Sequence, residues 1–95
     1  MFEWDGRKAA VNRAKHGVSF EEAATVFADP DALDGPDLGH SEEESRFLRL
    51  GGAATGRVLI VAYTVRRRDD GERIRIISAR RASRKERAAY AASRD

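Results

Sequence analysis

The sequence contains no cysteine, only two prolines and only two histidines. Without cysteine the chain has neither disulfides nor thiolate metal sites, and His16 and His40 are too few and too far apart for a typical zinc site. We therefore expect chemistry without a metal ion or cofactor, unless carboxylates bind magnesium. No apolar run approaches the roughly 18 residues that span a bilayer, and the N-terminus lacks the pattern of a signal peptide. These absences predict a cytoplasmic protein that does not bind membranes.

Charge is what the chain has in abundance. Of its 95 residues 36% are charged and 41% are hydrophobic, which is the composition of a folded single domain over residues 1–95. Residues 1–65 contain seven Lys/Arg and eleven Asp/Glu, a net charge of −4, whereas residues 66–95 contain eleven and five, a net charge of +6. The basic C-terminal third indicates a polyanion or an acidic protein as partner, with an ordinary solvated surface as the alternative.

The segment around residues 15–30 predicts two helices with almost no spacer between them. His16 places positive charge at the end of a first helix over residues 5–16, and Gly17 can adopt the left-handed conformation that closes it. Ser19 followed by Glu22 fits a capping box for a second helix of two to three turns.

Alternating apolar side chains predict three strands: residues 45–50, 57–65 and 73–80. The second of these is apolar on both faces and is therefore expected at the centre of the sheet. On the last strand, one face is expected to hold Ile74, Ile76, Ser78 and Arg80.

The segments between the strands contain turn-forming residues. Asp69-Asp70-Gly71 predicts a hairpin, Gly51-Gly52 and Thr55-Gly56 predict another turn, and residues 28–41 predict a loop with at most a short strand near residues 32–33. Phe2-Glu3-Trp4 fits a short strand or an apolar anchor. A capping box formed by Ser83 and Glu86 opens a C-terminal helix. The order predicts an α+β fold: two N-terminal helices, an antiparallel sheet of three to four strands with the helices on one face, and a C-terminal helix.

Several short blocks spread over nearly the whole chain form a recognisable pattern. They are Phe2-Glu3-Trp4-Asp5, Asn12, Lys15-His16-Gly17-Val18-Ser19-Phe20-Glu21-Glu22-Ala23, Asp29-Pro30, Glu43 to Phe47 and Ile76-Ile77-Ser78-Ala79-Arg80. Together they resemble the BrnT family, the toxin half of type II toxin–antitoxin systems. Gly6, where many relatives have proline, and the length of the tip between Arg66 and Glu72 depart from the family pattern.

The resemblance implies a RelE-like fold and a ribonuclease activity that restrains growth by cutting RNA. It also implies a cognate BrnA-type antitoxin, a ribbon–helix–helix protein that neutralises the toxin and binds DNA. DNA would then be contacted only through the antitoxin complex.

Metal-free RNA cleavage needs a base for the ribose 2′-OH, a cation near the phosphorane and an acid for the leaving 5′-oxygen. Arg80 is the first candidate for the cation, because it ends a strand next to a helix N-terminus; the alternative is a surface ion pair. Arg46, on a neighbouring strand, is a candidate second phosphate ligand or an ordinary salt-bridge partner. His16 is the candidate acid or base, since imidazoles titrate near neutral pH, although helix capping also explains it. Tyr90 lies on the last element, from which RelE-like toxins often draw a site residue, but its spacing also suits packing.

Other basic residues are candidates for binding the RNA: Lys15, Arg66, Arg67, Arg81 and Arg84. Glu43 and Glu44 are possible bases or a solvated acidic run, and His40 is expected to be solvated. We predict no metal ligands.

Three functions fit these observations. The first is a metal-independent endoribonuclease toxin. The second is a catalytically inactive partner subunit of a DNA-binding repressor complex. The third is a non-enzymatic RNA-binding module, which would bind RNA in a salt-dependent way without cutting it.

Overall fold

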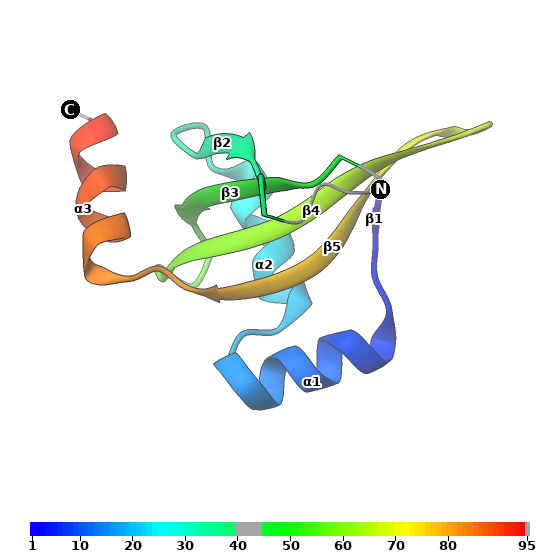
Figure 1. Cartoon of the computed structure of the whole chain (residues 1–95), viewed down its shortest axis with the longest axis horizontal. Coiled ribbons are helices and arrows are strands. Elements are labelled where there is room, and N and C mark those ends of the chain that lie inside the picture. Colours follow the sequence, from blue (N-terminus) through cyan, green and yellow to red (C-terminus); the bar gives the residue numbers. More distant parts are fainter. Residues whose placement is uncertain (40–44, 95) are drawn as a thin grey trace.

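The computed structural model describes residues 1–39 and 45–94, and these residues form helices around one five-stranded sheet (Figure 1). The helices are α1 (Gly6–His16), α2 (Phe20–Thr25), continued by the 3-10 turn η1 (Val26–Ala28), and α3 (Arg84–Ser93). The strands are β1 (Phe2–Glu3), β2 (Leu33–Pro36), β3 (Phe47–Gly52), β4 (Val58–Arg68) and β5 (Gly71–Arg81). Among the described residues, no helix is long and apolar enough to cross a membrane.

The two N-terminal helices follow the local signals of the sequence. The Asp5 side chain caps α1, and Gly17 ends it in the left-handed conformation with φ of 69°. The Ser19 hydroxyl accepts a hydrogen bond from the Glu22 N–H at 3.0 Å and so caps α2. The Glu22 carboxylate binds the Arg57 guanidinium, with Nε at 2.8 Å. The predicted helix boundaries are therefore confirmed, whereas Glu22 serves a distant ion pair in place of the second half of a capping box.

The hydrophobic core lies between α2 and one face of the sheet. Its fully buried side chains include Val18, Phe20, Val26, Leu59 and Val61. The alternate residues of β4, Ile60 and Ala62, are also buried, at 8% and 7% exposed. The predicted central strand is thus confirmed.

The sheet has more strands than expected, and it is mixed. Its order is β1-β5-β4-β3-β2, with β1 parallel to β5 and all other pairs antiparallel. The prediction of three to four antiparallel strands is therefore corrected to five. Both additional strands are short edge strands, and the Leu-Asp-Gly-Pro sequence of β2 carries turn signals. Proline is tolerated at a sheet edge, where its missing N–H is not needed for pairing.

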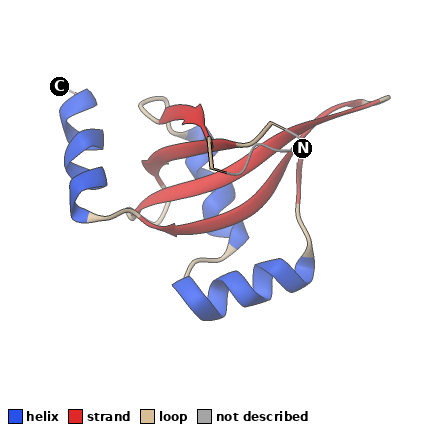
Figure 2. Ribbon diagram, in the orientation of Figure 1, coloured by secondary structure: helices blue, strands red, loops and turns tan. Residues whose placement is uncertain are grey.

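The helices do not all cover one face of the sheet. Figure 2 shows α2 across one face, α1 along the β5 edge and α3 at one end of the sheet. The expected arrangement is wrong for α3 because this helix has little apolar surface to bury: Tyr90 is its only buried residue among those described.

Gly51 and Gly52 lie in β3, so the predicted turn is confirmed at Thr55-Gly56, where Gly56 has a φ of 92°, and is wrong for Gly51 and Gly52. A Cβ at Gly51 would lie 2.8 Å from the Ala32 Cβ and 3.0 Å from the Val26 Cγ1. The Gly52 N–H donates to the Asp29 carboxylate at 2.8 Å. The glycines therefore permit close approach of another segment to the strand.

A bulge in β5 changes which side chains share a face. Ala62 pairs with Ser78 but Tyr63 pairs with Ile76, so Ile77 is an extra residue. Ile76 faces the core, and Ser78 faces the opposite side of the sheet. The predicted common face for Ile74, Ile76, Ser78 and Arg80 is therefore wrong, because strict alternation stops at the bulge.

Candidate active site

Asn12 fastens α1 to the edge of β5 and thereby positions the end of the helix. Its Nδ2 donates to the Ala79 carbonyl at 2.8 Å and the Val18 carbonyl at 3.1 Å, and its Oδ1 accepts from the Ala79 N–H at 3.1 Å. Since β1 pairs with β5 at only two positions, this carboxamide takes the place of a neighbouring strand further along β5. His16, one turn after Asn12, is consequently held beside the strand.

A cleft of about 240 Å³ opens on the sheet face opposite α2. Four side chains capable of acid–base chemistry or hydrogen bonding line it: His16 from the end of α1, Ser78 and Arg80 from β5, and Asp37 from the segment after β2. Its apolar lining includes Leu48, Ile60 and Ala62. The structure therefore brings together two of the predicted catalytic residues, His16 and Arg80.

Arg80 forms a two-pronged ion pair with Glu86 of α3. The Arg80 Nη1 and Nη2 atoms lie 2.8 Å and 2.9 Å from the two carboxylate oxygens of Glu86. Glu86 also completes the capping box with Ser83, which confirms that prediction. The Arg80 guanidinium, followed by these capping bonds, lowers the pKa of Glu86 to about 2, and the Glu86 hydrogen bond raises the pKa of Arg80. With 45% of its side chain exposed, Arg80 is oriented by this pair and still open to the cleft.

Tyr90 lies at a different hollow. It is 5% exposed, and its hydroxyl donates to the Asp29 Oδ2 at 2.5 Å, while the Arg94 guanidinium lies 5.3 Å from the centre of its ring. The hydrogen bond to Asp29 raises the pKa of Tyr90. These contacts anchor α3 to η1 and β3, and the structure does not bring Tyr90 to the cleft with His16.

Arg46 directly precedes β3 and is half-buried. Its carbonyl accepts from the Asp37 N–H at 2.9 Å, which places its backbone next to a cleft residue. It is not among the described residues that line the cleft. The next arginine on this strand, Arg49, binds the Asp34 carboxylate at 2.6 Å and the Val26 carbonyl at 3.2 Å, so its contacts are architectural.

The predicted RNA-binding residues are spread over the molecule. Lys15 lines a second hollow, which lies between α1 and β5 next to the cleft. Arg81, at the end of β5, lines a separate hollow together with Arg57 and Arg87. Arg84 is exposed at the first position of α3.

Arg66 and Arg67 lie far from Arg80, at the other end of the β4–β5 hairpin. They pair with Arg73 and Glu72 near the hairpin tip. At about 3.3 Å per strand residue, seven positions separate them from Arg80 by roughly 20 Å. They and Arg80 cannot contact the same phosphate.

Sequence reasoning missed three residues that shape the site. Asp37 lies in a turn-rich segment that carried no catalytic signal, and Glu86 was recognised only as a capping residue. Asn12 was noted only as part of the family pattern. His40, Glu43 and Glu44 lie outside the described residues. Within the described part of the chain, no group of three or more His, Cys, Asp or Glu side chains could hold a metal ion.

The fold and the cleft define a class: small α+β domains with acid–base and cationic side chains gathered on one face of the sheet. The family can also be stated. The chain belongs to the BrnT family, described as the ribonuclease toxin of type II toxin–antitoxin systems, whose model matches residues 4–86. It is therefore a toxin of this family.

A solved structure shows the same fold. The 1.1 Å crystal structure of the Brucella abortus ribonuclease toxin BrnT superposes with a TM-score of 0.63 at 24% sequence identity. The similarity covers 88% of this chain and 99% of the Brucella chain. No curated protein sequence matches this chain significantly.

Proposed function

We propose that this toxin is an endoribonuclease that cleaves RNA without a metal ion, in the cleft that holds His16 and Arg80. The observation that carries the proposal is the convergence of an imidazole, a guanidinium and a carboxylate, from Asp37, in one cleft. These are the three kinds of group that cleavage through the ribose 2′-OH requires.

In the proposed reaction, the 2′-oxygen attacks the adjacent phosphorus and its proton passes to a base. The 5′-oxygen leaves and takes a proton from an acid, which leaves a 2′,3′-cyclic phosphate and a 5′-hydroxyl. His16 and Asp37 are the two acid–base groups, and Arg80 stabilises the charge on the phosphorane. Glu86 acts as a positioning residue, because its two-pronged pair sets the plane of the Arg80 guanidinium.

The experiment uses the purified chain, free of antitoxin, with labelled RNA in the presence and absence of a chelator. We expect cleavage in both conditions, and 5′-hydroxyl ends that polynucleotide kinase can label directly. His16→Ala and Arg80→Ala should abolish cleavage, and both variants should have melting temperatures above the assay temperature. Arg80→Lys keeps the positive charge but loses the planar, two-pronged guanidinium, so it should be more active than Arg80→Ala and less active than the wild type. Intact RNA in both conditions, together with normal growth of cells that express the chain, would refute the proposal.

We further propose that a BrnA-type ribbon–helix–helix antitoxin is the partner, and that DNA is contacted only through that complex. Membership of a type II toxin family supports an antitoxin partner in general. Co-expression with the product of an adjacent small reading frame should restore growth and yield a complex that binds operator DNA. Failure of the two proteins to copurify would contradict this pairing.

The pairing of Arg80 with Glu86 also favours a second function, a catalytically inactive subunit of a repressor complex. In that case the guanidinium serves only to hold α3 in place. This alternative predicts that the unmodified chain is harmless to cells and that Arg80→Ala leaves repression unchanged. Arrest of growth by the wild-type chain alone excludes it.

A further inference from the structure

Helix α1 is basic at both ends, although only the cations of its last turn favour the helix dipole. It contains two arginines, two lysines and a histidine, and no Asp or Glu. Arg7 and Lys8 lie in its first turn, where a cation opposes the helix dipole, and only the Asp5 cap offsets them. Lys8 and Lys15 stand two turns apart on the same face of the helix, with Val11 between them.

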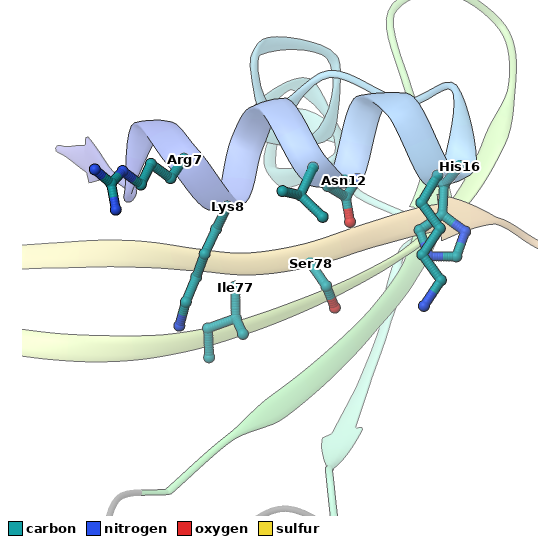
Figure 3. Close-up of a pocket in the computed structure, with 8 residues that line it drawn as sticks. Arg7, Lys8, Asn12, His16, Ile77 and Ser78 are labelled. Atoms are coloured by element: carbon teal, nitrogen blue, oxygen red, sulfur yellow. The ribbon is translucent and has the colours of Figure 1, made fainter.

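This face of α1 overlooks a hollow of about 330 Å³ against β5 (Figure 3). Arg7, Lys8 and Lys15 supply its cations, and Val11 and Ile77 supply apolar surface. Val11 is 65% exposed, so its apolar side chain is accessible to a ligand in the hollow. None of the three cations forms an ion pair with another described residue.

The bulge of β5 shapes this hollow. Because Ile77 is the extra residue, it and Ser78 both line the hollow, as Figure 3 shows beneath α1. A regular strand would direct neighbouring side chains to opposite faces. Bulges are common next to active sites because they redirect side chains in this way.

The hollow is continuous with the cleft. His16 and Ser78 line both, so the two spaces meet at these residues. A single-stranded RNA with its reactive phosphate at His16 and Arg80 would therefore continue along α1. Cations next to an apolar surface suit a nucleotide, whose phosphate is anionic and whose base has an apolar face.

We infer that the hollow between α1 and β5 is a binding subsite for the nucleotide next to the scissile phosphate, with its phosphate bound by Lys8 and Lys15 and its base against Val11 and Ile77. The inference rests on the proposed function. Because the hollow is continuous with the cleft, RNA is favoured as its ligand over an acidic segment of a protein. The contacts recognise the backbone and the base face, so this subsite adds affinity with little sequence preference.

The experiment compares a dinucleotide, which has one phosphodiester, with an RNA extended by several nucleotides on both sides. Lys8→Ala should raise the KM for the extended RNA by roughly fivefold, the effect of one lost charge-assisted contact, and leave kcat/KM for the dinucleotide unchanged. The dependence of log KM on log salt concentration should become shallower by about one unit. Val11→Ser, at an exposed position, should weaken binding of both substrates, because the dinucleotide keeps the base that contacts Val11 and lacks only the outer phosphate.

Arg13→Ala is the matched control, because it removes one positive charge from the opposite side of the same helix. It should change the KM and the kcat/KM of neither substrate by more than about twofold. Equal effects of Lys8→Ala and Arg13→Ala on the extended RNA would overturn the subsite while cleavage by the wild type upholds the proposed function. Loss of affinity for the antitoxin in Lys8→Ala, with unchanged RNA kinetics, would assign the hollow to a protein and also overturn the inference. If the wild type cleaves neither substrate, the proposed function itself fails, and binding of the extended RNA to Lys8→Ala and Arg13→Ala then tests the subsite by itself.

Discussion

Replacing Asn12 by alanine should lower the free energy of unfolding by more than a substitution on the exposed face of α1 would. The side chain is 7% exposed and makes three hydrogen bonds to backbone groups of Val18 and Ala79. At about 1 kcal/mol net for each bond, the loss is about 3 kcal/mol. The better helix propensity of alanine returns about 0.6 kcal/mol, so we expect a net loss of about 2–3 kcal/mol.

A loss of this size is measurable without unfolding the chain. A domain of this length has roughly 5–14 kcal/mol of stability, and each kcal/mol changes its melting temperature by about 4–8 °C. The single tryptophan, Trp4, packs edge-on against Phe20 at 6.0 Å in the core and reports global unfolding. Urea titration followed by its fluorescence should show a lower midpoint with an unchanged slope.

Two further variants sharpen this test. Arg13→Ala, at the next, exposed position, should be close to neutral. Asn12→Asp should be worse than Asn12→Ala at neutral pH, because a buried carboxylate cannot donate to the Val18 and Ala79 carbonyls. A loss below about 1 kcal/mol for Asn12→Ala, or a loss equal to that of Arg13→Ala, would refute the role assigned to this carboxamide.

Three other outcomes follow from the contacts described above. The pKa of Glu86 in the folded chain, about 2, lies below its ordinary value of 4.5, so its stabilising contribution is present above pH 4.5 and is lost as the pH falls towards 2. Discounted for partial exposure, the contribution of Glu86 to the free energy of unfolding is about 1–2 kcal/mol. When the unfolding free energy is measured as the pH is lowered, Glu86→Gln should lose less stability than the wild type by about this amount. Gly51→Ala should cost about 1–3 kcal/mol by urea unfolding, since its Cβ would have three neighbouring atoms at 2.8–3.1 Å, whereas Gly35→Ala, with no heavy atom within 4 Å, should be near neutral. Tyr90→Phe should lose about 1.5–3 kcal/mol with its hydrogen bond to Asp29, measured by thermal melting; a variant that keeps its melting temperature but no longer cleaves RNA would contradict the anchoring role.

The parts of the fold that sequence reasoning predicted depend on residues a few positions apart. The left-handed Gly17, the Ser19 cap and the capping box of Ser83 and Glu86 each involve at most four consecutive residues. Capping energies act locally, so the sequence reveals them before the tertiary structure is known. The apolar pattern of β4 was equally clear, because burial on both faces leaves no polar alternation.

The candidate site was predicted only in part. His16 and Arg80 were named from their chemistry, and the structure places both in one cleft. Tyr90 was named on the same grounds, but its hydroxyl is bonded to Asp29, 61 positions away in the chain. Pairing at that separation leaves no local pattern in the sequence.

By itself, then, the sequence determined the helix boundaries, the central strand, the basic C-terminal third and the family. Tertiary structure alone decided that β1 and β2 extend the sheet, that a bulge turns Ser78 away from the core, and that Asn12 joins α1 to Ala79, 67 positions further along the chain. The physical reason is the separation along the chain between the interacting groups. Caps and turns gain their free energy from neighbours in the chain, whereas edge pairing, bulges and clefts gain theirs from groups that meet only when the whole core closes.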